Sequence, residues 1–397
     1  MSIRSAIVFN CNYNGLSIIR ELGSRGIPVI AMDCVRSVGT FSKYAKYVKC
    51  PDPLKDEASF IEFLLEKGKG FDLKPVLFPT NDLWVFAVSK NMDKLSKYYS
   101  FCGSDFSTVD LLLKKKKFSK WASDRGYPVP LSWDFDQCNE ITDENYPVIV
   151  KPEYRRSDEV GESSFYEVLD DLRFTVLESK EELESFRGKY SGKLNFFMIQ
   201  EYIRGMSDTM FTVGVYCKKG TVIALFKGRK VRGYPADIGD CVVGEISGVP
   251  DSVINVVKSI CKDLSYDGIA EFEFKKDSFD GRFRLIEINP RSWSWVGITP
   301  YCGVNLPLIA YQNISEIYSG DSFVESKGGE GSVKYIKILE DFQNCLWLYR
   351  KSGYPEWGKT FKQWKKSLKC DKLVVAEYDK RDFLPLLFAI YRFFKRR

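Results

Sequence analysis

The first 33 residues follow a strand, helix, strand pattern, which constrains the fold more than any other feature of the sequence. SAIVFN (residues 5–10) is a short apolar run, GLSIIRELGSRG (residues 15–26) has the apolar spacing of an amphipathic helix ending at glycine, and IPVIAMD (residues 27–33) is a second apolar run. Two strands joined by a helix favour a parallel pair in one sheet. The alternation continues through residues 60–95, so we expect a doubly wound α/β domain over residues 1–108.

Polar residues gather just after two of these expected strands. Open α/β sheets bind ligands at the carboxyl ends of their strands, but Asn and Asp are also ordinary turn formers. A ligand role and a turn role therefore both stay open for these residues, which are Asn10, Asn12, Asn14, Thr80, Asn81 and Asp82.

The composition excludes several kinds of chemistry. The chain of 397 residues contains no histidine, which removes histidine-activated nucleophiles and histidine metal ligands. Its eleven cysteines include no C-x-x-C pair, so they favour free thiols in a reducing cytoplasm. The net charge of +6 is spread along the chain and gives no support for nucleic-acid binding. Carboxylates, lysines, arginines and a metal remain as the available groups.

Neither export nor membrane spanning is expected from this sequence. The N-terminus MSIRSAIVFN lacks the apolar region and cleavage site of a secretory signal. No stretch reaches the roughly 18 consecutive apolar residues of a membrane-spanning helix.

The segment RLIEINPRSWSW (residues 284–295) is an apolar strand that ends in polar groups. Glu287 and Asn289 point to one face, because side chains alternate along a strand. The preceding strand, IAEFEFKKD (residues 269–277), carries Glu271 and Glu273 on one face, and a hairpin brings Glu273 near Glu287. Two acids inside apolar strands are costly to bury without a cation, so we expect a divalent metal site. Mg²⁺ suits it, because this ion prefers oxygen ligands.

Cationic residues stand at several strand and helix ends upstream. A long helix is expected over residues 109–125 and carries a run of four lysines, and YPVIVKPEY (residues 146–154) places Lys151 at the end of a strand. The polar segment RRSDEVGESS (residues 155–164) has the composition of a mobile flap, and FFMIQEYIRG (residues 196–205) is a strand that turns polar at Gln200. A hairpin over residues 211–235 presents basic residues that bind an anion or merely keep the strand soluble: Lys227, Arg229, Lys230 and Arg232.

These motifs in this order resemble the ATP-grasp superfamily of carboxylate-amine ligases, most closely stand-alone ligases with a carbamoyl-phosphate-synthetase-like ATP-grasp domain. The resemblance covers the chain to about residue 314 and rests on KKKKF, GYPVP, VIVKP, IQEYIRG, GIAEFEFKKD and IEINPR. It implies a mixed α/β and α+β fold. Its parts are a pre-ATP-grasp domain (1–108), an ATP-grasp domain (109–320) whose lid covers about 145–205, and a C-terminal helical extension with a basic amphipathic tail (321–397).

The resemblance also implies roles for individual residues. Lys115 and Lys151 contact the nucleotide phosphates, with Lys116 as an alternative to Lys115. Gln200, Glu201, Tyr202 and Ile203 belong to the segment that meets adenine, and Asp208 lies near the ribose. Arg291, with Lys151, Arg229 and Arg232, serves catalysis by holding phosphate or substrate carboxylate. Glu273, Glu287 and Asn289 bind one or two Mg²⁺ ions, for which Mn²⁺ substitutes.

The implied reaction is the ATP-dependent joining of a carboxylate to an amine through an acyl phosphate, with release of ADP and phosphate. It needs no histidine, because cations and positioning supply the catalysis. The substrates are expected to be small molecules, such as amino acids or uronic acids, and cell-envelope or capsule synthesis is the expected context. Two alternatives stay open: another ATP-grasp C-N ligase of primary metabolism, and a nucleotide-binding module without activity. Trp293 and Trp295 either shape the acceptor pocket or pack in the core.

The final segment, DFLPLLFAIYRFFKRR (residues 382–397), is apolar with a basic end. It is too short to span a bilayer. Two interpretations stay open: an interfacial anchor at the inner face of the membrane, or a terminal helix packed on the body or on a second subunit.

Overall fold

A computed structural model describes residues 3–153, 174–234, 239–317, 322–351 and 357–395. The chain divides into two compact units. Unit 1 contains residues 1–109, 206–273 and 289–397, and unit 2 contains residues 110–205 and 274–288. This division differs from the three consecutive segments expected from the sequence, because the C-terminal residues supply strands to a sheet of unit 1.

A five-stranded parallel sheet forms the N-terminal part of unit 1, with strand order β3-β2-β1-β4-β5. Side chains of β1 alternate between its two faces: Val8 packs with α1, and Ile7 packs with α2 and α3. The predicted doubly wound arrangement is therefore confirmed. Its elements are β1 (Ala6–Phe9), α1 (Tyr13–Gly23), β2 (Val29–Asp33), η1 (Val38–Phe41), β3 (Ala45–Lys49), α2 (Glu57–Gly68), β4 (Val76–Pro79), α3 (Asp82–Lys90), α4 (Met92–Leu95) and β5 (Ser100–Phe101).

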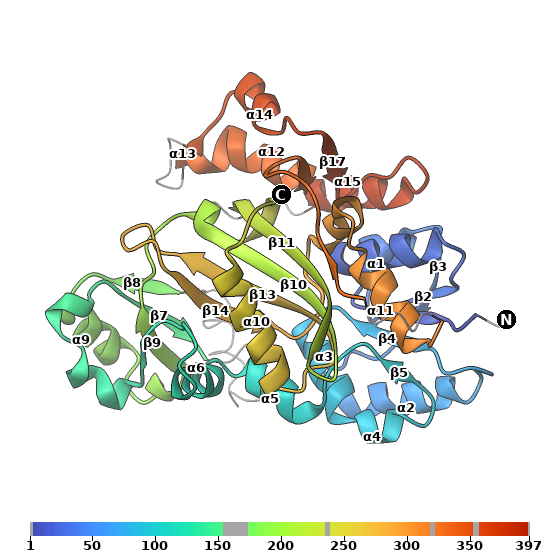
Figure 1. Ribbon diagram of the computed structural model, residues 1–397, viewed down its shortest axis with the longest axis horizontal. Coiled ribbons are helices and arrows are strands. Elements are labelled where there is room, and N and C mark those ends of the chain that lie inside the picture. Colours follow the sequence, from blue (N-terminus) through green and yellow to red (C-terminus); the bar gives the residue numbers. More distant parts are fainter. Residues whose placement is uncertain (1–2, 154–173, 235–238, 318–321, 352–356, 396–397) are drawn as a thin grey trace. The chain divides into compact units, whose positions relative to one another are not determined.

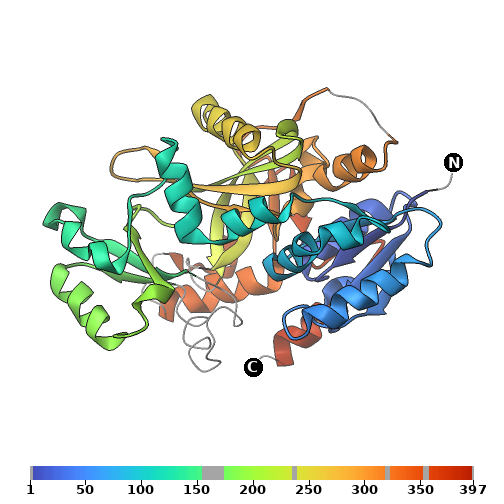
Figure 2. The same ribbon diagram turned by 90° about the horizontal axis from the view of Figure 1, so that it is seen from below.

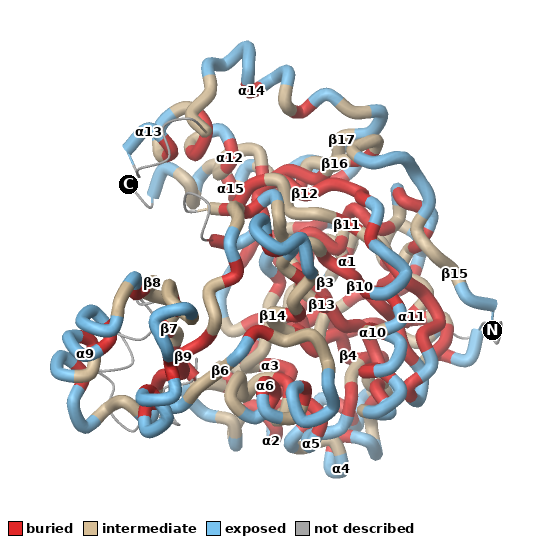
Figure 3. Tube along the Cα trace, turned by 60° about the vertical axis from the view of Figure 1, so that its left-hand side comes forward, coloured by how far each residue is buried: buried red, intermediate tan, exposed pale blue. Residues whose placement is uncertain are grey.

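An eight-stranded, largely antiparallel sheet has the order β14-β13-β10-β11-β12-β16-β17, with β15 paired to β11 (Figure 1). The predicted hairpin is β10 and β11, whose register pairs Phe211 with Arg229. Figure 3 shows that β10, β11 and β12 are buried over most of their length. The elements from this region are η5 (Ser207–Thr209), β10 (Met210–Lys218), β11 (Thr221–Tyr234), β12 (Asp240–Ile246), α10 (Asp251–Asp263), β13 (Gly268–Lys276), β14 (Phe283–Asn289), η6 (Val296–Cys302) and α11 (Leu306–Ile314).

The C-terminal residues are not simply a helical extension, and that part of the fold prediction is corrected. They contribute three strands, because short apolar runs such as VKYI complete the sheet beside β12 and β11. Figure 2 shows the last helix, α15, beside the N-terminal elements of the same unit. The elements are β15 (Val324–Glu325), β16 (Val333–Ile336), α12 (Ile338–Gln343), the π-helix η7 (Asn344–Leu348), α13 (Tyr349–Lys351), α14 (Phe361–Ser367), β17 (Lys372–Val375) and α15 (Leu384–Lys395).

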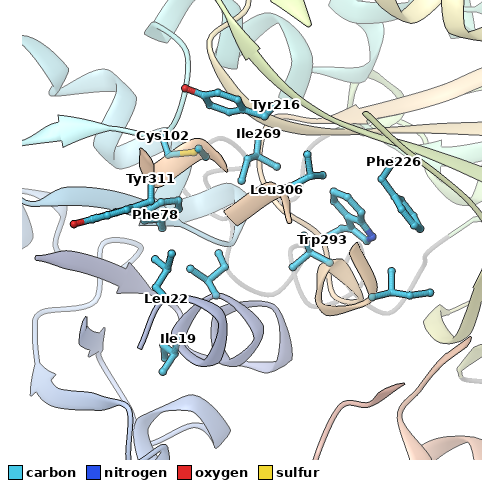
Figure 4. Packing of buried hydrophobic residues seen from close by; sticks show 14 of the residues in the cluster. Ile19, Leu22, Phe78, Cys102, Tyr216, Phe226, Ile269, Trp293, Leu306 and Tyr311 are labelled. Atoms are coloured by element: carbon cyan, nitrogen blue, oxygen red, sulfur yellow. The ribbon is translucent and has the colours of Figure 1, made fainter. Parts of the chain in front are cut away.

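Trp293 and Trp295 lie in the core of unit 1, which decides between their two predicted roles. They are 1% and 2% exposed, and the ring of Trp293 stacks on that of Phe226 at 5.9 Å (Figure 4). Glycines on the sheet make room for both indoles: a Cβ at Gly244 would meet the ring of Trp295 at 2.6 Å, and one at Gly214 would overlap the ring of Trp293. The two tryptophans therefore pack in the core.

Unit 2 is built on a four-stranded sheet of order β6-β9-β7-β8. Its core gathers Val148 and Val150 of β7 with Phe186 of α9 and Phe197 of β9. The helix expected over residues 109–125 is interrupted at Lys114, which separates α5 from α6, and the predicted flap lies outside the described residues. The elements are α5 (Phe106–Leu113), α6 (Lys115–Asp124), β6 (Ser132–Trp133), η2 (Phe135–Glu140), η3 (Asp143–Asn145), β7 (Val148–Pro152), β8 (Thr175–Leu177), α9 (Lys180–Lys189), η4 (Leu194–Phe196) and β9 (Phe197–Glu201).

Candidate active site

In unit 1, the side-chain amide of Asn289 joins two carboxylates. Asn289 Nδ2 donates to Glu271 Oε2 at 3.0 Å and to Glu273 Oε1 at 2.9 Å. Thr212 Oγ1 donates to the other oxygen of Glu271 at 3.1 Å. Glu271 and Asn289 are buried, with 5% and 8% exposure. These N–H and O–H donors offset the repulsion between two acids that face the same way on β13.

Arg291 continues this network toward the N-terminal sheet. Its Nη2 donates to Asn289 Oδ1 at 3.1 Å, while Nε and Nη2 donate to the two oxygens of Asp82 at 2.6 and 3.3 Å. Asp82 starts α3, directly after β4. Arg291 is the residue predicted to stabilise an acyl phosphate. Its guanidinium is thus oriented by two hydrogen bonds to Asp82, which lies at the switch point of the parallel sheet.

The other polar residues at this sheet edge make mostly structural contacts. Asn14 Nδ2 donates to the carbonyls of Thr80 and Ser292, at 2.8 and 2.7 Å. Thr80 Oγ1 donates to the carbonyl oxygens of Phe9 and Asn10. Asn81 caps α3 by accepting the Leu83 N–H. Asn81 thus acts as a helix cap, and Asn14 and Thr80 tie together segments that are far apart in the sequence.

The oxygen donors of this cluster suit a hard cation. Glu273 offers a carboxylate and Asn289 an amide oxygen, which here accepts from Arg291, and Mg²⁺ commonly takes only one or two protein carboxylates. Within the described ranges, no group of three or more Cys, Asp or Glu side chains converges as a metal site. Glu287, two residues before Asn289 on β14, falls in unit 2, and its role as a ligand stays a prediction.

In unit 2, two of the predicted phosphate-binding lysines lie at the end of β7. Lys151 Nζ donates to Gln200 Oε1 at 2.7 Å, and Gln200 Nε2 donates to Ser132 Oγ at 2.9 Å. Lys115 Nζ donates to the carbonyl oxygen of Pro152, the residue after Lys151. The pairing of β7 with β9 sets Ile149 opposite Gln200. This register explains why Lys151, two residues further along β7, meets Gln200.

The rest of the lysine run faces other partners. Lys114 and Lys117 both pair with Asp110, at 2.8 and 2.7 Å, and Lys116 Nζ pairs with Asp134 at 2.7 Å. The Lys116 backbone N–H donates to the carboxylate of Glu153, whose pKa is raised by burial. The position of Lys115 beside β7 favours it over Lys116 as the residue that meets phosphate.

The predicted adenine segment lies at the end of β9. Glu201 pairs with the segment after α6: its backbone N–H donates to the Leu131 carbonyl at 2.8 Å, and its carboxylate accepts the Leu131 N–H at 3.0 Å. Tyr202 lies under Lys275 Nζ at 5.4 Å, and Ile203 is buried. Asp208, on η5, is exposed and belongs to unit 1.

One catalytic assignment is corrected. Arg232 was expected to hold phosphate or substrate carboxylate, but its Nε and Nη2 donate to both oxygens of Asp341 at 2.6 and 2.8 Å. Both side chains are buried, with 3% and 0% exposure, and Trp364 Nε1 also donates to Asp341. Register shifts in the pairing of β11 with β12 lie on both sides of Arg232. Arg229 is less buried and pairs with Glu245 at 2.5 Å and Glu330 at 3.2 Å.

Sequence reasoning missed some members of the cluster. Glu271 was recognised as sharing a face with Glu273 but was not assigned to the site, although its same-face spacing was a usable signal. Asp82 was considered only for turn or ligand roles, because nothing in the sequence indicates that it meets Arg291 more than 200 positions away. Thr212, on β10, carried no signal at all.

Comparisons with known proteins find relatives of low sequence identity. No protein-family model matches the chain. The chain is 24% identical over 286 residues to the D-aspartate ligase of Enterococcus faecium, covering 67% of this chain and 65% of that protein. It is 22% identical over 293 residues to the N-terminal section of the carbamoyl phosphate synthase large chain of Methanopyrus kandleri, covering 70% of this chain and 49% of that protein. The chain thus spans about two thirds of the length of the first relative and about half of the length of the second.

Solved structures agree. An L-amino acid ligase from Bacillus licheniformis has a TM-score of 0.57 at 15% identity, over 79% of this chain and 75% of that one. The biotin carboxylase domain of the Hydrogenobacter thermophilus 2-oxoglutarate carboxylase, in complex with MgADP, has a TM-score of 0.59 at 15% identity, over 79% and 70%. The chain therefore shares the fold of these two solved structures, and the fold that the motifs indicated is confirmed.

Proposed function

We propose that this protein is an ATP-dependent carboxylate-amine ligase. The observation that carries the proposal is the buried cluster in which Asn289 joins Glu271 and Glu273 and, through its other amide atom, meets Arg291. An oxygen-rich cluster ending in a guanidinium suits a metal-bound phosphate and a developing acyl phosphate. The two ligases among the relatives and solved structures support the same reaction class.

The residues have separate tasks in the proposed reaction. Glu273, Glu287 and Asn289 would hold Mg²⁺, which supplies charge neutralisation when a carboxylate approaches the γ-phosphate of ATP. Lys115 and Lys151 attract the phosphate oxygens, and Arg291, oriented by Asp82, faces the carboxylate that is being activated. The substrate carboxylate displaces ADP from the γ-phosphorus. The amine then attacks the acyl carbon, and phosphate leaves.

The test is a screen for Mg²⁺-dependent ADP release from the full chain with pairs of carboxylates and amines. D-Aspartate and L-aspartate are the first carboxylates to try, because the Enterococcus faecium relative is a D-aspartate ligase. ADP release that requires both substrates supports the ligase. Nucleotide binding without turnover across a broad panel favours a binding module instead.

The metal assignment has its own control. Glu287→Gln keeps the size of the side chain and removes one charge, so turnover is expected to fall at least a hundredfold while the thermal unfolding midpoint changes little. Full activity in this variant would refute Glu287 as a metal ligand.

We also propose that α15 contacts an anionic lipid surface. One side of the helix packs in unit 1, where Ala389 lies with Leu16 and Val38, and Phe388 stacks on Phe41 at 4.3 Å. This packing agrees with the terminal-helix interpretation. The opposite side is exposed at helical spacing and is flanked by cations that complement acidic lipid headgroups. Its residues are Leu384, Leu387, Tyr391 and Phe394, with Lys380, Arg381, Arg392 and Lys395 nearby in sequence.

Point changes test this contact better than deleting the helix, because deletion would uncover Leu16 and Val38. Leu387→Glu with Tyr391→Glu is expected to abolish sedimentation with phosphatidylglycerol vesicles and leave the fold intact. Vesicle binding that is absent in the unchanged protein, or equal in the variant, would overturn the proposal. No described helix has the length and apolar character needed to cross a membrane.

A further inference from the structure

Lys337 is a buried lysine from the C-terminal part of unit 1. It follows β16 and stands at the start of α12, where its backbone N–H donates to the Val242 carbonyl at 2.9 Å. Only 5% of its side chain is exposed. The position is therefore determined by the pairing of β16 with β12, and the side chain has little freedom to move into solvent.

The ammonium group of Lys337 has weak contacts for so buried a charge. Its nearest carboxylate oxygen in the described part of the chain is Glu340 Oε2 at 4.0 Å, the limit of an ion pair, and it lies 5.4 Å from the ring centre of Tyr13. Lys334, three residues earlier, instead donates to the Ser367 carbonyl at 3.0 Å. A buried ammonium without a close anion is costly, and an oxyanion bound beside it would offset that cost.

The surroundings of Lys337 connect the two features of unit 1 already described. Tyr13 opens α1 just beyond the carboxyl end of β1, at the switch point of the parallel sheet. On another side lies Cys241, whose pKa is raised by burial to about 12; it lies within electrostatic range of Lys230, Lys337, Glu271 and Glu273. Lys337 is thus close to the ligand-binding edge of the parallel sheet, and Cys241 is a neighbour that it shares with the carboxylates of the candidate active site.

We propose that Lys337 binds an oxyanion of a substrate, a carboxylate or a phosphate, at the active site. The inference rests on the proposed function, because a ligase must hold a free carboxylate beside its metal cluster without a histidine to do so. The resemblance that identified the other site residues ends near residue 314, so this lysine extends the site into the C-terminal strands. Their role is then to supply a binding residue as well as to complete the sheet.

The experiment measures anion binding to the full chain by isothermal titration calorimetry in the presence of MgADP. The probes are D-aspartate, which carries carboxylates, and inorganic phosphate. Lys337→Met retains the apolar stem and removes the charge. The dissociation constant for at least one probe is expected to rise at least tenfold, and the probe affected tells which oxyanion the lysine holds. Lys372→Met, an exposed lysine on β17, is the matched control and should change neither constant.

Two further readouts separate a binding role from a structural one. Removing a buried charge with a distant partner should leave the thermal unfolding midpoint unchanged or raise it, and Lys337→Arg should recover most of the lost affinity. Unchanged binding of both probes in Lys337→Met, or no binding of either probe by the unchanged protein, overturns the proposal.

The outcome can be told apart from a failure of the ligase itself. If probe binding depends on the charge of Lys337 but no substrate screen gives ADP release, Lys337 remains a binding residue and the ligase is rejected. Turnover that Lys337→Met leaves unchanged, together with unchanged binding, would retain the ligase and reject Lys337.

Discussion

At the scale of single residues, neighbours decide function more than residue type does. Four consecutive lysines have the same chemistry, yet Lys115 Nζ donates to the Pro152 carbonyl at the end of β7 while Lys114 and Lys117 share Asp110. Because successive positions of a helix point in different directions, we propose Lys115 as the lysine of this run that meets phosphate.

This contrast gives a matched pair of variants. Lys115→Ala is expected to raise the KM for ATP at least tenfold, because it removes a cation beside Lys151. Lys117→Ala removes only a surface ion pair and should stay within twofold of the unchanged protein. Steady-state ADP release at varied ATP checks both. Equal KM values in the two variants would contradict the choice of Lys115.

At the scale of elements, the main sheet depends on glycines that admit the two indoles. Gly244 on β12 leaves space for Trp295, and an added Cβ would lie 2.6 Å from its ring. Gly244→Ala should therefore lower the free energy of unfolding by about 1 to 3 kcal/mol through overpacking. Gly248, whose added Cβ meets nothing within 4 Å, is the control and should change stability little on substitution by alanine. Urea unfolding of both variants measures the difference.

A second element, the start of α12, donates hydrogen bonds to a buried acid that follows β17. Glu377 is fully buried and accepts the backbone N–H groups of Ile338 and Leu339 at 3.1 and 3.4 Å, but burial still raises its pKa to about 7. The folded state holds the proton of the Glu377 carboxyl group more tightly than the unfolded state does. The resulting stabilisation of the folded state is complete below about pH 4.5 and is lost as the pH rises to about 7.

The pH dependence of unfolding tests this. Between pH 5 and pH 8 the unchanged protein should lose about 2 to 3 kcal/mol more of its unfolding free energy than Glu377→Gln, which cannot ionise. Denaturant unfolding across this range provides the comparison. Parallel stability curves for the two proteins would show that Glu377 does not titrate there.

At the scale of the whole molecule, the C-terminal residues are an integral part of unit 1. They add β16 and β17 to the main sheet and pair Asp341 with Arg232 in the interior. Asp341→Asn leaves the Arg232 guanidinium buried with one neutral partner, so we expect a loss of about 3 to 5 kcal/mol in unfolding free energy. Arg232→Met combined with Asp341→Leu should cost much less than either single change. Additive losses in thermal unfolding would contradict this coupling.

Much of this organisation was predictable from local signals. The parallel N-terminal sheet followed from the alternation of apolar runs and amphipathic helices, and the fold shared with the solved L-amino acid ligase followed from the order of motifs ending in IEINPR. The extra strands of the C-terminal part were not predictable, because four-residue runs such as VKYI do not reveal their partners. Neither was the burial of Arg232, because its partner Asp341 stands 109 positions further along the chain.

The sequence by itself determined the available chemistry and the order of the elements. A chain without histidine, with paired acids on one strand face and lysines at strand ends, is limited to chemistry by metal, carboxylate and cation. The tertiary structure decided which residues of each type meet: Asp82 with Arg291, Asn289 with Glu271, and Lys337 near Tyr13. The physical reason is that periodicity is read within one segment, whereas these contacts join segments that only packing brings together.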